Sequence, residues 1–88
     1  AGIIGGTGAR SGGSYSGVAP GSKIIGAGLG AGLFVLNAIG AWEWGLTNQY
    51  RYNIRIVSNS YGTSGAFNPN APLNVASRMA YERNMTVF

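Results

Sequence analysis

The sequence predicts an α/β fold in which helices connect parallel strands. Two short runs rich in apolar and β-branched residues, 54–58 and 85–88, are typical of strands, and a third apolar run, 23–27, precedes them. Stretches with helical periodicity lie between these runs. Because strands that alternate with helices usually form one parallel sheet with right-handed crossovers, we expect the order β-α-β-α-β.

The first strand and the first helix are predicted from turn residues and periodicity. Residues 17–21 form a turn, since Pro20 fixes its own φ and Gly21 can adopt a positive φ. Residues 23–27 then read as a strand, and residues 33–50 as a helix that is buried on one face. The apolar stripe of that helix, at spacings i, i+4, i+7 and i+11, consists of Val35, Ile39, Trp42 and Leu46.

The second half of the chain repeats the strand, loop and helix pattern. The strand at 54–58 ends in small polar residues and a glycine, and Pro72 can occupy the first turn of a helix that we expect over 72–83. A last strand is predicted at 85–88. Parallel strands end at the same edge of a sheet, where α/β proteins place their sites, so we expect the loop after residue 58 to serve a site.

Composition limits the chemistry that the chain can perform. Its 88 residues include 16 Gly and two acidic residues, Glu43 and Glu82, but no Asp, His or Cys. No catalytic constellation and no metal site can be assembled from these residues, and we expect no cofactor. The net charge of +4 is spread along the chain, so we expect no nucleic-acid partner.

Two further interpretations come from the apolar, glycine-rich part of the chain. Residues 26–31 match G-x-G-x-x-A between a predicted strand and helix, which would suit a nucleotide-binding turn, although no acidic residue follows the next strand to hold a ribose. Residues 24–42 are apolar enough to suggest a membrane-inserting segment. The strand and glycine turn within it, with Glu43 near its end, favour a buried strand and helix, and we expect no membrane partner.

The order of short motifs along the chain carries a family resemblance. Ala1-Gly2-Ile3-Ile4-Gly5-Gly6 is followed by Gly17-Val18-Ala19-Pro20, by the Trp-bearing helix, by Ser58-Asn59-Ser60-Tyr61-Gly62, and by Met85-Thr86-Val87-Phe88. Together these segments resemble the middle of a subtilisin-like serine protease, between the helix of the catalytic histidine and the oxyanion asparagine. The resemblance implies that residues 1–88 are the central, incomplete part of a three-layer α/β peptidase domain that continues on both sides.

The resemblance also implies roles for particular residues. Ser60, Tyr61 and Gly62 are similar to the family's strand end that lines the primary specificity pocket, although Ser58 replaces the usual Asn. Gly30, Ala31 and Gly32 are similar to the edge to which an extended polypeptide substrate adds as a strand. The Ser-His-Asp triad would belong to the parent enzyme, so the chain itself would contain no catalytic residue. Most relatives are secreted, and we expect an isolated fragment with exposed strand edges to self-associate.

Overall fold

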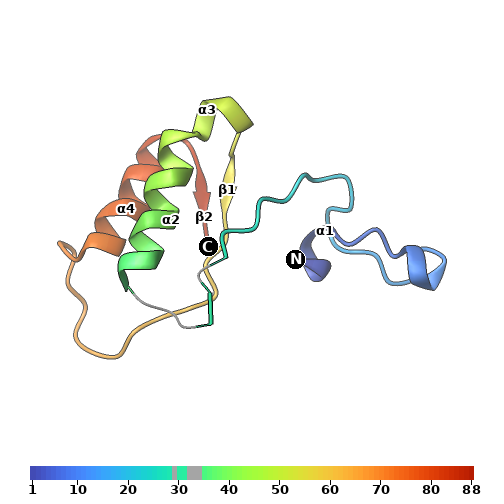
Figure 1. Ribbon diagram of the computed structural model, residues 1–88, viewed down its shortest axis with the longest axis horizontal. Coiled ribbons are helices and arrows are strands. Elements are labelled where there is room, and N and C mark those ends of the chain that lie inside the picture. Colours follow the sequence, from blue (N-terminus) through green and yellow to red (C-terminus); the bar gives the residue numbers. More distant parts are fainter. Residues whose placement is uncertain (29, 32–34) are drawn as a thin grey trace.

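The computed structural model describes residues 1–28, 30–31 and 35–88 (Figure 1). Helices account for 42% of these residues and strands for only 5%. The elements, in chain order, are α1 (Gly2–Gly5), a 3₁₀ turn (Ala9–Ser11), α2 (Val35–Thr47), α3 (Gln49–Tyr52), β1 (Ile56–Val57), α4 (Pro72–Glu82) and β2 (Thr86–Val87).

The predicted β-α-β-α-β segment of a three-layer fold is wrong. The described residues form only two short strands, β1 and β2, which pair in parallel with Ile56 opposite Thr86 and Val57 opposite Val87. Residues 23–27, predicted as the first strand, belong to no helix or strand. Gly26 and Gly28 lower the strand propensity of this segment, and its residues are exposed, so little apolar burial favours pairing.

The core lies between α2, α4 and the two strands. Trp42 of α2, Ala80 of α4 and Met85 before β2 are buried, and α2 packs directly on α4. Both helices lie on the same side of the β1–β2 pair (Figure 1). The partly buried residues around this core are Leu46, Ile54, Val57, Leu73, Ala76 and Val87.

The predicted helix over residues 33–50 is divided in the structure. The α2 helix ends at Thr47, and a separate turn of helix, α3, follows from Gln49 to Tyr52; its C-cap residue, Asn53, has a left-handed φ of 52°. Gln49 is buried at this corner, where its Nε2 donates a hydrogen bond to the Arg83 carbonyl oxygen at 2.8 Å. The corner therefore joins α3 to the end of α4, a contact between residues distant in sequence.

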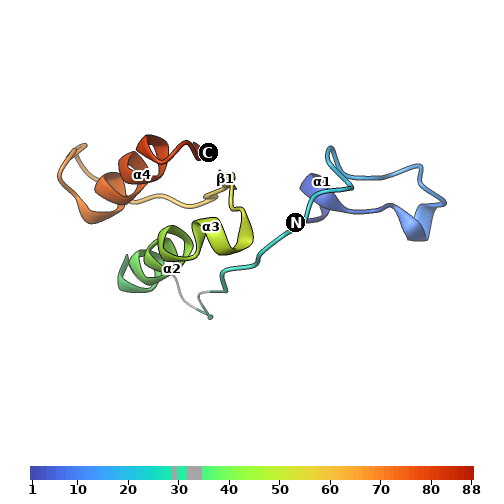
Figure 2. The same cartoon turned by 90° about the horizontal axis from the view of Figure 1, so that it is seen from above.

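The first 21 residues form a separate hairpin-like unit away from the helices (Figure 2). Its backbone is held by hydrogen bonds from Gly17 to Gly6, from Val18 to Ile3 and from Ala19 to Ile4, at 2.7, 3.0 and 2.7 Å. Within the described part of the chain, α1 and the 3₁₀ turn contact no other helix or strand. The radius of gyration is consequently 14.9 Å, against about 12 Å for a compact domain of this length.

Candidate substrate-binding site

The loop between β1 and α4, residues 58–71, carries three of the six residues predicted to bind substrate. Ser60, Tyr61 and Gly62 come after β1, separated from it by Ser58 and Asn59, and all three are exposed. Among the described residues, no atom lies within 4 Å of the position that a Cβ atom on Gly62 would occupy. The backbone on either side of Tyr61 is therefore accessible to a ligand, as the predicted role requires.

Asn59 joins the beginning of this loop to the end of the chain's last strand. Its backbone N–H and its side-chain Nδ2–H both donate to the Phe88 carbonyl oxygen, at 2.8 and 3.1 Å. The Phe88 N–H in turn donates to the Val57 carbonyl oxygen at 2.9 Å. The two backbone bonds continue the parallel pairing beyond β1 and β2, and the side-chain bond adds to them, so that Asn59 lies beside Phe88.

The side chain of Tyr61 is attached to the core through Trp42. The indole Nε1–H of Trp42 donates to the Tyr61 hydroxyl oxygen at 3.2 Å. Trp42 is 7% exposed and Tyr61 is 37% exposed, so the hydrogen bond lies at the edge of the core. The Tyr61 ring therefore faces helix α2, while the adjoining backbone remains at the surface.

The predicted strand-addition edge lies apart from this loop in the hydrogen-bonding network. Gly30 and Ala31 form an exposed turn in which Gly30 has a φ of 80°, whereas Gly32 lies outside the described residues. No hydrogen bond between described residues connects Gly30 or Ala31 with Ser60, Tyr61 or Gly62. A positive φ is also not the extended conformation that strand addition uses.

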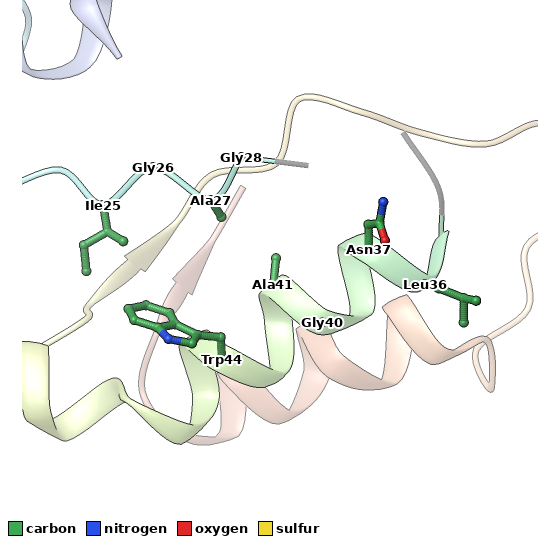
Figure 3. Close-up of a pocket in the computed structure, with 9 residues that line it drawn as sticks. All are labelled: Ile25, Gly26, Ala27, Gly28, Leu36, Asn37, Gly40, Ala41 and Trp44. Atoms are coloured by element: carbon green, nitrogen blue, oxygen red, sulfur yellow. The ribbon is translucent and has the colours of Figure 1, made fainter. Parts of the chain in front are cut away.

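A hollow of about 560 Å³ separates the extended segment before Gly30 from one side of α2 (Figure 3). Ile25 and Ala27 point across it toward the helix, and the Trp44 ring lies below Ile25. The residues that line it are Ile25, Gly26, Ala27, Gly28, Leu36, Asn37, Gly40, Ala41 and Trp44. The lining side chains are mostly apolar, but polar and apolar atoms contribute almost equally to the exposed lining.

The described residues offer no cluster of metal-coordinating side chains. They contain no group of three or more His, Cys, Asp or Glu side chains that could coordinate a metal ion. Among the helices that the structure describes, none is both long enough and apolar enough to span a bilayer. The end of the parallel strand pair presents exposed backbone groups at Ser60 and Gly62, with the Tyr61 hydroxyl turned toward Trp42.

Two residues that matter for this site were not identified from the sequence. Trp42 was assigned only to the apolar stripe of a helix, and Asn59 only to a motif. A buried Trp usually finds a partner for its indole N–H, which predicts that a hydrogen bond exists. The identity of that partner depends on a contact across 19 residues, which periodicity does not reveal.

Comparisons with known proteins do not identify a family. No protein-family model matches the sequence. No solved structure is significantly similar to this one.

Proposed function

We propose that this chain forms part of the substrate-binding cleft of a subtilisin-like serine endopeptidase. The proposal rests on the ordered motifs in the sequence and on one structural observation, the paired hydrogen bonds from Asn59 to the Phe88 carbonyl oxygen. Those bonds hold the start of the Ser60–Gly62 segment beside the end of the last strand. In the proposed enzyme, the oxyanion asparagine would follow that strand.

This neighbourhood suits the chemistry of peptide hydrolysis. A substrate carbonyl must lie within about 3 Å of the oxyanion donors while the residue before the scissile bond fills the specificity pocket. A pocket wall and an oxyanion donor must therefore be adjacent. The end of β1 and the end of β2 meet this requirement, because parallel strands reach the same edge together.

The triad would come from other parts of a longer polypeptide. The chain has no His and no Asp, so none of its serines can be paired with an imidazole base within the chain. Its contribution would be positioning of the substrate, and the polypeptide would be bound through main-chain groups. We therefore expect the 88-residue chain to hydrolyse no peptide by itself.

The nucleotide-binding alternative has less support from the geometry. Gly26 and Gly28 face the side of α2 across the hollow, and none of the residues that line it carries a charge. A pyrophosphate is usually held by a helix N-terminus or by cationic side chains. Titration with a dinucleotide is the direct test, and the protease proposal predicts no binding.

The proposal is tested with the longer polypeptide, assayed on peptides that differ in the residue before the scissile bond. Gly62→Val adds a side chain where the structure leaves open space. We expect kcat/KM for substrates with a large residue at that position to fall about 10-fold or more, with a smaller loss for substrates with alanine there. Ser64→Val, in the same exposed loop, is the matched control and should leave the preference unchanged.

Three results would contradict the proposal. One is the absence of peptide hydrolysis by the longer polypeptide under any condition in which it is folded. Another is hydrolysis that a serine-directed covalent inhibitor leaves intact. Equal losses for large and small substrates in Gly62→Val would remove Ser60–Gly62 from the pocket.

A further inference from the structure

The β1–α4 loop has a single interior attachment in the described structure. Asn59 fixes its beginning on Phe88, and the turn at Asn68 fixes its end, where Asn74 Nδ2 donates to the Asn68 carbonyl oxygen at 2.7 Å. Between these points, over residues 60–67, the hydrogen bond from Trp42 to Tyr61 is the only one between described residues.

The Trp42 side of this attachment is packed into the core. Trp42 lies in the middle of α2 and belongs to the buried cluster with Ala80 and Met85. Its indole ring cannot turn without disturbing the contact between α2 and α4. Core packing therefore holds the Trp42 indole N–H in place, and the hydrogen bond holds the Tyr61 hydroxyl group against it.

We infer that Tyr61 is a positioning residue, whose hydroxyl group anchors the Ser60–Gly62 backbone on Trp42. This inference rests on the proposed function, because it assigns Tyr61 an indirect part in substrate binding. The Tyr61 hydroxyl oxygen accepts from the indole, so the ring faces α2 and the neighbouring backbone is what meets the substrate. Tyr61 would thus act through Ser60 and Gly62 and not as a pocket wall.

The decisive substitution is Tyr61→Phe, which removes the accepting oxygen and keeps the ring. Losing one neutral hydrogen bond corresponds to about a 3- to 10-fold effect. We expect KM for peptides to rise by that factor in the longer polypeptide while kcat stays within about 2-fold, the pattern of lost uniform binding. Tyr81→Phe, an exposed tyrosine of α4, is the matched control and should change neither constant.

A spectroscopic measurement on the 88-residue chain tests the anchor independently of catalysis. In a Trp44→Phe background, Trp42 supplies the only indole N–H resonance. We expect Tyr61→Phe to shift that resonance and to lower the backbone order parameters of residues 60–67 on the ps–ns timescale. Tyr81→Phe should leave both unchanged.

The outcomes separate the inference from the proposed function. An unchanged indole resonance and unchanged loop order in Tyr61→Phe would overturn the inference, even if the longer polypeptide is a serine peptidase. A lowered unfolding midpoint with unchanged KM would overturn it as well, because Tyr61 would then be only structural. If the anchor is present but no peptide is hydrolysed, the proposed function fails and the positioning role in substrate binding fails with it.

Discussion

At the scale of single residues, Gly17 shows how a close backbone approach determines which residue is acceptable. A Cβ atom on Gly17 would lie 2.7 Å from the Gly6 nitrogen and 2.8 Å from the Gly2 carbonyl oxygen. Both neighbours are backbone atoms, which cannot move aside as the end of a flexible side chain could. The first residue of the Gly17-Val18-Ala19-Pro20 motif is thus explained by packing alone, without reference to any family.

We expect Gly17→Ala to separate residues 17–19 from residues 3–6. Forcing a methyl group into this contact should cost about 1–3 kcal/mol of local stability. Amide hydrogen exchange of Val18 and Ala19, which donate to Ile3 and Ile4, measures the loss. Gly21→Ala is the control, because nothing lies within 4 Å of its Cβ position. Unchanged protection of Val18 and Ala19 in Gly17→Ala would contradict the prediction.

At the scale of elements, the packing of α2 against α4 positions Trp42, the residue that contacts the candidate site. Ala80 of α4 is 0% exposed and packs in one buried cluster with Trp42 of α2. Trp42 packs beside Ala80, and its indole N–H donates a hydrogen bond to Tyr61 in the β1–α4 loop. The position of the candidate site therefore depends on the spacing between these two helices.

Ala80→Leu should push α2 and α4 apart. Overpacking of a filled core costs about 1–3 kcal/mol, so we expect the free energy of unfolding in urea to fall by that amount. The shift should also weaken the Trp42–Tyr61 hydrogen bond, visible at the indole resonance. Arg78→Leu introduces the same side chain on the exposed face of α4 and should have little effect. Equal stability of the two variants would show that the interface tolerates added volume.

At the scale of the whole molecule, the described residues cover one face of the β1–β2 pair, the face toward α2 and α4. Val57 and Val87 pack toward the helices, so the residues next to them in each strand point to the opposite face. Ile56 is 62% exposed and Phe88 is 72% exposed on that face. A two-stranded sheet with an uncovered apolar face and open edges is a surface for association.

We expect the isolated chain to self-associate through this face, and Ile56→Lys to reduce the association. A charged side chain there opposes both apolar contact and edge pairing. Sedimentation velocity over a range of concentrations measures the distribution of species. Tyr50→Lys changes an exposed aromatic residue of α3 to the same charge and should leave that distribution unaltered. A monomeric chain at all concentrations would contradict the prediction.

Local sequence was sufficient for the elements whose boundaries are marked by strong local preferences. The helix expected over residues 72–83 is observed as Pro72–Glu82, with Pro72 in its first turn. The strands expected at 54–58 and 85–88 are observed as shorter, parallel pieces. The family resemblance groups Gly30 and Ala31 with Ser60–Gly62, but no hydrogen bond between described residues links the two segments.

Non-local contacts account for the remaining differences. The sequence of residues 23–27 favours a strand, but a strand must pair with the edge of a neighbouring strand. Whether residues 23–27 can reach β1 or β2 depends on how the intervening helix α2 packs. The loop motif Ser58–Gly62 was visible in the sequence, whereas the orientation of Tyr61 follows from its hydrogen bond to Trp42, 19 residues away. The preference of the backbone for helix, strand or turn depends on a few neighbouring residues, so the local sequence predicts it. Burial and hydrogen bonding between distant segments arise only once α2 and α4 have packed together.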